Sequence, residues 1–290
     1  MLINQIFNGL TIGSIYALIA LGYSQVYGIL GFINFAHGDL FMLGAYVGFL
    51  LVSFLHVGLV PALILSMLIV GGIGVLVERV AYRPLRKAAR LAPMISSIGV
   101  SVTLQTAIVL LIGPQTERYP LEYQFPVLDI LGVKISALQI IILVVAIVLM
   151  LGLELLVQKT RIGMAMRATA ENYEATSLMG VSINKVISLT FLLGSSLGAA
   201  AGVLVAVYYN AFFPYIGSLF GIKAFIAAVL GGIGSVRGAV IGGFILGISE
   251  IFAVAYLSSS WRDAVAFTLL IIILLARPTG ILGMKTTVRA

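Results

Sequence analysis

The sequence predicts an all-α, polytopic membrane protein with about 8–9 transmembrane or half-membrane helices. Only 9% of its residues are charged, against roughly 25% in soluble domains, and 61% are hydrophobic. A soluble fold needs a polar surface, which this composition cannot provide. Stretches without Asp, Glu, Lys or Arg are also long enough to cross a bilayer, and they cover 1–38, 40–77, 91–116, 135–153 and 186–222.

These uncharged stretches divide into individual elements by length and by their breaks. The first is too long for one helix and too short for two, so we expect a span over 2–28 and then a bent segment over 29–39. The second divides into two spans near His56 and Pro61. Three more spans are expected at 93–112, 136–156 and 186–208, followed by three elements, some of them half-helices, at 219–236, 238–257 and 263–277. The whole chain, 1–290, is predicted to be a single transmembrane domain, and no internal repeat is evident.

The position of the charges predicts the orientation. Basic residues crowd 79–90, recur in 158–185 and end the chain at Arg277, Lys285 and Arg289, whereas basic and acidic residues are mixed in 113–134. Lys and Arg accumulate in cytoplasmic loops. We therefore expect a cytoplasmic C-terminus and an extracytoplasmic N-terminus. The net charge of +7 follows from this topology and does not indicate nucleic-acid binding.

No residue pattern indicates catalysis or a metal site. The chain has no Cys and only two His, and it has no phosphate-binding loop of the GxxxxGK[ST] type. An enzyme is therefore not expected, no catalytic or metal-binding residue is assigned, and any ATP chemistry must reside on another chain.

Polar residues within apolar sequence are the candidates for a transport pathway. Asn34, His37 and Asp39 lie close together in the bent segment, where buried polar groups either line a cavity or hold a broken helix together. Asp39 could instead cap the next helix. Glu250 lies in the middle of an apolar run, where it could face a polar passage, pair with a basic group or lie near the outer surface.

Small residues recur every four positions at Gly194, Gly198 and Gly202. Such a stripe allows another helix to approach closely. The neighbouring helix could belong to this chain or to a partner.

The segment 158–185 is the only sizeable polar stretch expected on the cytoplasmic side. Its residues 164–179 favour a single short amphipathic helix, ended by Gly180 in a left-handed turn. Ala168, Ala175, Leu178 and Met179 are expected on one face, and Arg167, Glu171 and Glu174 in water. Such a helix either rests on the membrane surface or docks a cytoplasmic protein.

The heptapeptide 174–180 is similar to the EAA loop of ABC importer permeases, with Thr176 in place of the second Ala. Together with 34–39, 44–46, 161–163 and 231–235, it resembles the LivH-type permease subunit of the high-affinity branched-chain amino-acid ABC importer family. This resemblance extends over essentially the whole chain.

The resemblance implies a permease subunit of the bacterial cytoplasmic (inner) membrane, with no cofactor of its own. Its partners would be a second permease subunit, two cytoplasmic ATPase subunits that hold ATP and Mg, an extracytoplasmic substrate-binding protein, and membrane lipid. In that family the loop fits a cleft on the ATPase, which assigns the coupling role to Arg167, Glu171, Glu174, Ala175 and Gly180. Whether the second permease is a copy of this chain or a different one stays open.

Other functions are compatible with parts of the sequence. Permeases of the same family for urea or short amides would look alike. An ion-coupled secondary transporter would need buried ionisable residues, for which Asp39, Glu250 and Lys223 are the only candidates. A passive pore is a further alternative.

Overall fold

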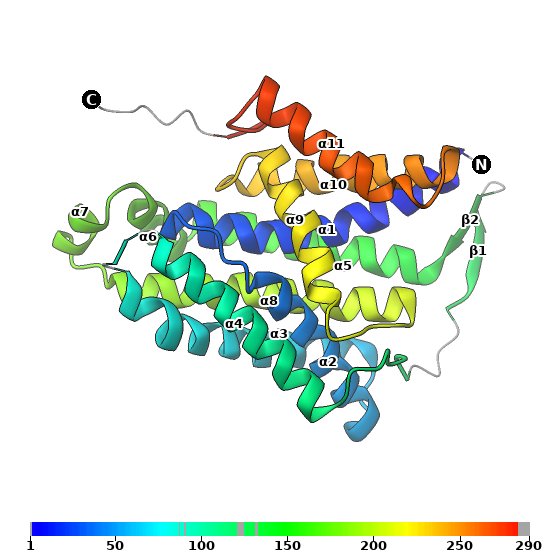
Figure 1. Ribbon diagram of the computed structural model, residues 1–290, viewed down its shortest axis with the longest axis horizontal. Coiled ribbons are helices and arrows are strands. Elements are labelled where there is room, and N and C mark those ends of the chain that lie inside the picture. Colours follow the sequence, from blue (N-terminus) through cyan, green and yellow to red (C-terminus); the bar gives the residue numbers. More distant parts are fainter. Residues whose placement is uncertain (1, 87, 90, 121–124, 131–132, 284–290) are drawn as a thin grey trace.

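The computed structural model describes residues 2–86, 88–89, 91–120, 125–130 and 133–283 (Figure 1). The basic residues Lys87, Arg90, Lys285 and Arg289, which were used to predict the orientation, lie outside the described residues. Within the described chain the fold is a bundle of long helices, as predicted.

Seven helices are long and apolar enough to cross a membrane. They are α1 (Leu2–Leu30), α2 (His37–Leu55), α3 (Leu59–Val77), α4 (Leu91–Leu111), α5 (Ala137–Lys159), α8 (Ile183–Tyr209) and α10 (Val236–Tyr256). The helices α9 (Ile216–Gly231) and α11 (Trp261–Ala276) have 16 residues each and complete the set. Seven candidate spans and two shorter helices among the described residues agree with the predicted polytopic, all-α membrane fold.

The bundle has two distinct ends. At the first, α3 continues into a π-helical turn (Glu78–Tyr82) and a 3-10 turn (Arg83–Leu85), and α6 (Arg161–Glu171) and α7 (Tyr173–Leu178) project from the bundle (Figure 1). We call this the basic end. At the second lie the N-terminus and an antiparallel hairpin of β1 (Val127–Ile130) and β2 (Val133–Ser136). We call this the hairpin end; its strands were not predicted.

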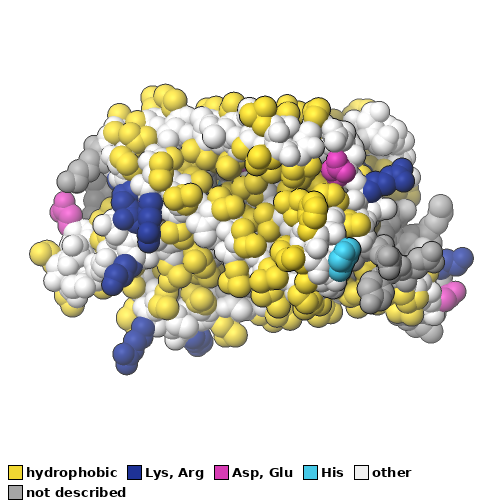
Figure 2. Space-filling model, turned by 90° about the horizontal axis from the view of Figure 1, so that it is seen from below, with side chains coloured by type: hydrophobic (Ala, Val, Ile, Leu, Met, Phe, Trp, Pro, Cys, Tyr) yellow, Lys and Arg dark blue, Asp and Glu magenta, His cyan; other side chains and the backbone are white. Residues whose placement is uncertain are grey.

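Side-chain type follows this division. In Figure 2 most of the visible basic side chains lie at the left, which is the basic end, and a broad apolar surface occupies the middle of the molecule. Exposed apolar residues on α3 and α4, among them Leu68, Leu76, Ile95 and Val102, contribute to the apolar surface of the protein. An apolar belt with cations at one rim is the surface expected of a protein that spans a bilayer.

The prediction of one helix over 164–179 is wrong. Asn172 has an extended backbone, with φ −157° and ψ 111°, and it separates α6 from α7. Its side-chain Oδ1 accepts a hydrogen bond from Ala175 N at 2.9 Å, so Asn172 acts as the N-cap of α7. Asn favours caps because its side chain replaces a missing backbone partner.

The predicted apolar face of this segment is also wrong. Leu178 and Met179 are 88% and 83% exposed, whereas Met166, Thr169 and Thr176 are the buried side chains. The break at Asn172 changes the register between the two helices, so a single helical period cannot describe both. The left-handed turn at Gly180 is confirmed by its φ of +82°.

The bent segment after α1 is confirmed, but α2 begins at His37, earlier than expected. Asp39 therefore lies inside the first turn of the helix, and the N-cap position is Ala36, which makes no side-chain cap. The capping role considered for Asp39 is wrong for this reason.

The glycine stripe of α8 packs against helices of the same chain. Gly194 faces Gly22 of α1, Gly198 faces the His37 ring and Gly202 lies against the backbone of Phe41. Of the two alternatives for this stripe, intramolecular packing is therefore the observed one. Close backbone approach is a common basis of helix packing in membranes, where apolar side chains gain little from leaving lipid.

The two halves of the bundle form an inverted repeat that the sequence did not reveal. Gly31, the residue after α1, has φ +70°, and α2 starts six residues after it. Asn210, the residue after α8, has φ +48°, and α9 also starts six residues after it. Both connections form the same turn, with His37 N bonded to Asn34 O and Ile216 N bonded to Phe213 O. The order α1–α2–α3–α4 is thus repeated by α8–α9–α10–α11 in the opposite direction.

The two starting turns meet each other. A Cβ at Gly38 would overlap Gly217 O, and a Cβ at Gly217 would lie against Gly38 O, so only glycine allows this crossing. One turn further on, Phe41 and Phe220 stack with ring centroids 5.3 Å apart. Both α2 and α9 therefore begin inside the bundle, and α2 runs to the hairpin end while α9 runs to the basic end.

Two glycine substitutions test the close packing. Gly44→Ala should lower stability by about 1–3 kcal/mol, because the new methyl group would overlap the backbone of Ala199 on α8. Gly72→Ala, on α3, has open space around its Cβ and should leave stability unchanged or raise it by up to about 1 kcal/mol. Thermal unfolding of the purified protein in detergent compares the two, and equal melting temperatures would contradict the described contact.

Candidate functional site

In the break between α1 and α2, side-chain oxygens accept hydrogen bonds from backbone N–H groups that have no helical partner. The Oδ1 atom of Asn34 accepts hydrogen bonds from Ala36 N at 3.1 Å and from the Tyr82 hydroxyl at 2.7 Å. Phe35 N donates to Ser97 Oγ at 3.2 Å. Irregular backbone at membrane depth is tolerated only with such partners. Asn34 therefore ties the break to the π-helical turn, and Phe35 ties it to α4.

His37 is buried in the centre of the bundle. Its ring packs edge-on against Tyr23, with centroids 4.6 Å apart, and fills the space left by Gly22 and Gly198. Among the described residues neither ring nitrogen makes a hydrogen bond of normal geometry, although the Ile19 backbone lies close enough to interact. His37 thus occupies the centre of the break without a fixed polar partner.

Asp39 lies at the crossing of three helices. Gln105 of α4 donates from Nε2 to Asp39 Oδ1 at 2.8 Å and to Ser218 Oγ of α9 at 3.0 Å. Asp39 and Ser218 occupy equivalent positions of the inverted repeat, each two residues after its helix begins. A single amide from α4 therefore bridges the two halves at their point of contact.

The break places partial positive charge and a negatively charged carboxylate close to each other. Helix N-termini carry partial positive charge, and two of them meet here beside one carboxylate. Discontinuous helices that begin inside the membrane are a typical way of presenting polar groups to a passing solute. The structure thus brings Asn34, His37 and Asp39 together in one polar break, as the sequence indicated.

Glu250 is located elsewhere. Its carboxylate lies 3.1 Å from Lys223 Nζ and accepts a hydrogen bond from the Tyr16 hydroxyl at 2.8 Å. Lys223 also pairs with Asp263 of α11 at 2.8 Å. This network joins α1, α9, α10 and α11, so its geometry favours the ion-pairing alternative for Glu250. A pathway role for Glu250 stays a prediction.

The residues predicted for coupling all lie at the basic end. Arg167 donates from Nη1 to the carbonyls of Val157 and Gln158 at 2.7 and 3.1 Å, which fixes α6 against the end of α5. Arg167 also makes a side-chain bond to Gln158. Glu171, Glu174 and Ala175 are exposed, and Gly180 closes α7.

Tyr173 connects this end to the polar break. Its hydroxyl donates to the carbonyl of Ile29, in the last turn of α1 and directly before the break. Burial raises the pKa of the Tyr173 phenol, opposed by the nearby Arg86, so the phenol stays protonated and can donate. Met166 of α6 packs in the same cluster as Val26 and Ile29. A displacement of α6 and α7 would therefore act on α1 next to the break.

Sequence reasoning missed three residues of this site. Gln105 is the only amide in α4, and a lone amide in an apolar helix could have been singled out on that ground. Tyr82 and Ser218 gave no such signal, because their role depends on distant contacts.

Comparisons with known proteins give one consistent result. The family described as "Branched-chain amino acid transport system / permease component" matches residues 5–274. The chain is 47% identical to the permease protein BraD of a high-affinity branched-chain amino acid transport system in Pseudomonas aeruginosa, over 97% of this chain and 95% of BraD. It is 45% identical to the corresponding LivH of Escherichia coli K12, over 97% and 95%. A probable LivH of Methanocaldococcus jannaschii is 30% identical over 93% and 89%. No solved structure matches the chain significantly.

Substitution of Gln105 tests the bridge between the halves. Gln105→Leu should lower stability by about 1–3 kcal/mol, because the buried carboxylate of Asp39 would lose one of its hydrogen-bond donors. Thr103→Val on the same helix removes an exposed hydroxyl bonded to Gly99 O and should cost far less. Thermal unfolding of both variants measures the difference, and a Gln105→Leu protein as stable as Thr103→Val would show that the bridge contributes nothing.

Proposed function

Because this chain belongs to the family of permease components of branched-chain amino acid transport systems, we propose that it is a membrane subunit of an ATP-driven importer of branched-chain or related amino acids. The chain is a multi-pass membrane protein, and we place it in the bacterial cytoplasmic membrane with the basic end inside. A second related permease subunit, two ATPase subunits and an extracytoplasmic binding protein would complete the importer. ATP and Mg would be held by the ATPase subunits.

The projecting α6–α7 segment carries this proposal. Leu178 and Met179 expose large apolar side chains at the tip of the molecule, next to Glu174. Water-facing apolar groups beside a charge are typical of a protein contact surface. The same segment contains the heptapeptide that is similar to the ATPase-contacting loop of ABC importers.

The route from this contact to the pathway is short. Closure of the ATPase subunits on ATP would move α7, which is bonded through Tyr173 to Ile29 at the end of α1. The next residues form the break that contains Asn34, His37 and Asp39. We propose that this break is the gate and that its movement alternates access between the two ends.

The polar groups at the gate suit a zwitterion. A carboxylate group favours helix N-termini, and an ammonium group favours Asp39. Neither contact discriminates between side chains, so the binding protein would select the substrate. Urea or a short amide, as alternative substrates within this family, would leave Asp39 without a cation to attract.

An ion-coupled secondary transporter is less well supported. Glu250 and Lys223 neutralise each other within an ion-pair network. Of the three candidates for ion coupling, Asp39, Glu250 and Lys223, this leaves only Asp39 outside an ion pair with a described residue. Uptake into vesicles separates the two mechanisms. Uptake by an ABC importer requires ATP on the side of the membrane where its ATPase subunits lie, and it continues when the ion gradient is dissipated. Uptake by a secondary transporter stops when the gradient is dissipated.

Charge reversal tests the coupling surface. Glu174→Lys should reduce amino-acid uptake at least about tenfold and release the ATPase subunits on purification, because a surface contact acquires the wrong charge. Glu117→Lys makes the same change in charge at the hairpin end and should retain uptake. Normal uptake and ATPase retention in a well-expressed Glu174→Lys protein would refute the coupling role.

Cysteine labelling tests the orientation, since the natural chain contains no cysteine. Leu178→Cys should react with a membrane-impermeant maleimide only in inside-out vesicles, because α7 is placed in the cytoplasm. Thr116→Cys, in the exposed loop at the hairpin end, should react only in right-side-out vesicles. The reverse pattern would overturn the orientation while leaving the fold unaffected.

A further inference from the structure

A basic cavity lies between α3 and α8 at the basic end, away from the polar break. Its volume is about 340 Å³, close to the lower limit of the roughly 300–1,000 Å³ typical of small-molecule sites. Its polar lining consists of Arg79, Arg83, Asn184, Lys185 and Ser188, and its apolar lining of Val75, Leu189 and Leu192.

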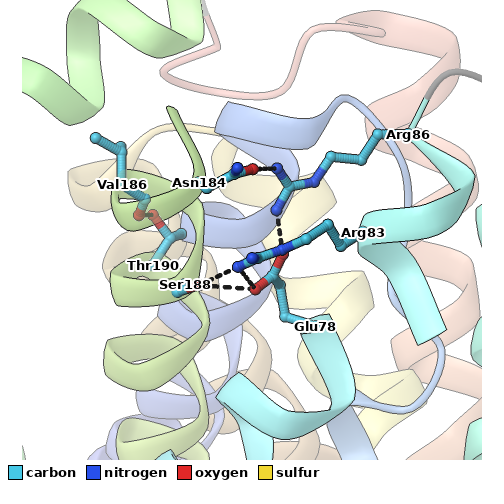
Figure 3. A network of polar contacts seen from close by, with 7 residues as sticks. All are labelled: Glu78, Arg83, Arg86, Asn184, Val186, Ser188 and Thr190. Carbon is cyan, nitrogen blue, oxygen red and sulfur yellow. Dashed lines mark hydrogen bonds and ion pairs between the residues drawn. The ribbon is translucent and has the colours of Figure 1, made fainter. Parts of the chain in front are cut away.

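One carboxylate organises the arginines beside this cavity. Glu78 is completely buried, and Arg83 binds it through two nitrogens at 3.0 and 3.2 Å (Figure 3). Arg86 also donates to Glu78 Oε1. Ser188 of α8 donates to Glu78 Oε2 at 2.7 Å and accepts from Arg83 at 2.9 Å. Figure 3 shows these side chains converging from the π-helical turn, the residues directly after it and α8. The wall of the cavity is therefore preorganised.

The π-helical turn accounts for this geometry. Arg83 N donates to Glu78 O, five residues earlier, so the two side chains come into register on one face of a widened turn. Arg86 also donates to Asn184 Oδ1 at 2.7 Å, which joins the turn to the start of α8.

The cavity has an excess of positive charge. Glu78 neutralises one of the two arginines that bind it, and Arg79 and Lys185 have no carboxylate within ion-pair distance among the described residues. None of the residues lining the cavity is acidic. The four cations are Arg79, Arg83, Arg86 and Lys185, and the one carboxylate is Glu78. Together they leave a net charge of +3, which favours the binding of an anion.

We propose that this cavity binds the phosphate of an anionic phospholipid. The cations lie at the rim of the apolar belt, where headgroups are found, and Val75, Leu189 and Leu192 give the cavity an apolar wall. Leu68 and Leu76 of α3 are also exposed apolar residues. A free phosphate ion would use only the cations, whereas a lipid would use both the cations and the apolar wall.

Lipid retention tests this site. The full chain, purified in the membrane complex in which it is expressed, is reconstituted in phosphatidylcholine with or without phosphatidylglycerol, and bound lipid is measured by native mass spectrometry. The natural protein should retain phosphatidylglycerol. The double variant Arg79→Gln/Lys185→Gln should retain it about 30-fold less strongly, from roughly fivefold for each cation removed. Arg79 and Lys185 both lie outside the Glu78 network, so the melting temperature of the double variant in phosphatidylcholine should equal that of the natural protein.

The double variant Lys159→Gln/Arg161→Gln is the matched control, because it removes the same charge at the same end from exposed positions outside the cavity. It should retain phosphatidylglycerol as the natural protein does. Equal loss in both variants would overturn the site in favour of general attraction to the membrane surface. Displacement of the lipid by inorganic phosphate would identify a small-anion site instead. Lipid bound only after the complex is dissociated would show that a partner protein occupies the cavity.

Discussion

The crossing of two helix starts at Gly38 and Gly217 is the contact on which the architecture depends. A helix that begins inside a membrane leaves backbone donors far from water, and each of them requires a partner. Here the preceding turns, Asn34 and Ser97 provide such partners. Because neither glycine has a side chain, the two starts come close enough for one amide, Gln105, to reach both.

A few residues connect the crossing of α2 and α9 to the basic end of the molecule. The last turn of α1 bears the contact with Tyr173, and the π-helical turn bears the contact with Asn34. Both contacts join the polar break to segments at the basic end. The same end also contains the Glu78 network, so α3 and α8 are fixed to each other close to the place where α6 and α7 project. The basic end thus combines a network that joins α3 to α8 with a projecting, exposed α6–α7 segment.

Much of the fold could be predicted from the sequence, because membrane spans are determined by length and apolarity. The spans were placed within a few residues, and the clustering of Asn34, His37 and Asp39 followed from their proximity along the chain. Contacts between distant segments could not be predicted in this way. Nothing local indicates that Gln105 reaches Ser218 or that Tyr82 reaches Asn34. The exposed position of Leu178 was missed because Asn172 interrupts a period that otherwise favours one continuous helix.

The inverted repeat has a consequence for how the two halves can differ in sequence. A single crossing, α5, carries the chain from the hairpin end to the basic end, so the second half starts on the side opposite to the first. The connection after α3 is rich in arginine, while its counterpart after α10, residues 257–260, is a leucine and three serines. If both halves descend from one duplicated segment, selection for charge on opposite faces of the bilayer would have erased their likeness in these connections first. Ancestry in such proteins is therefore better sought in matching turns and glycine crossings than in aligned residues.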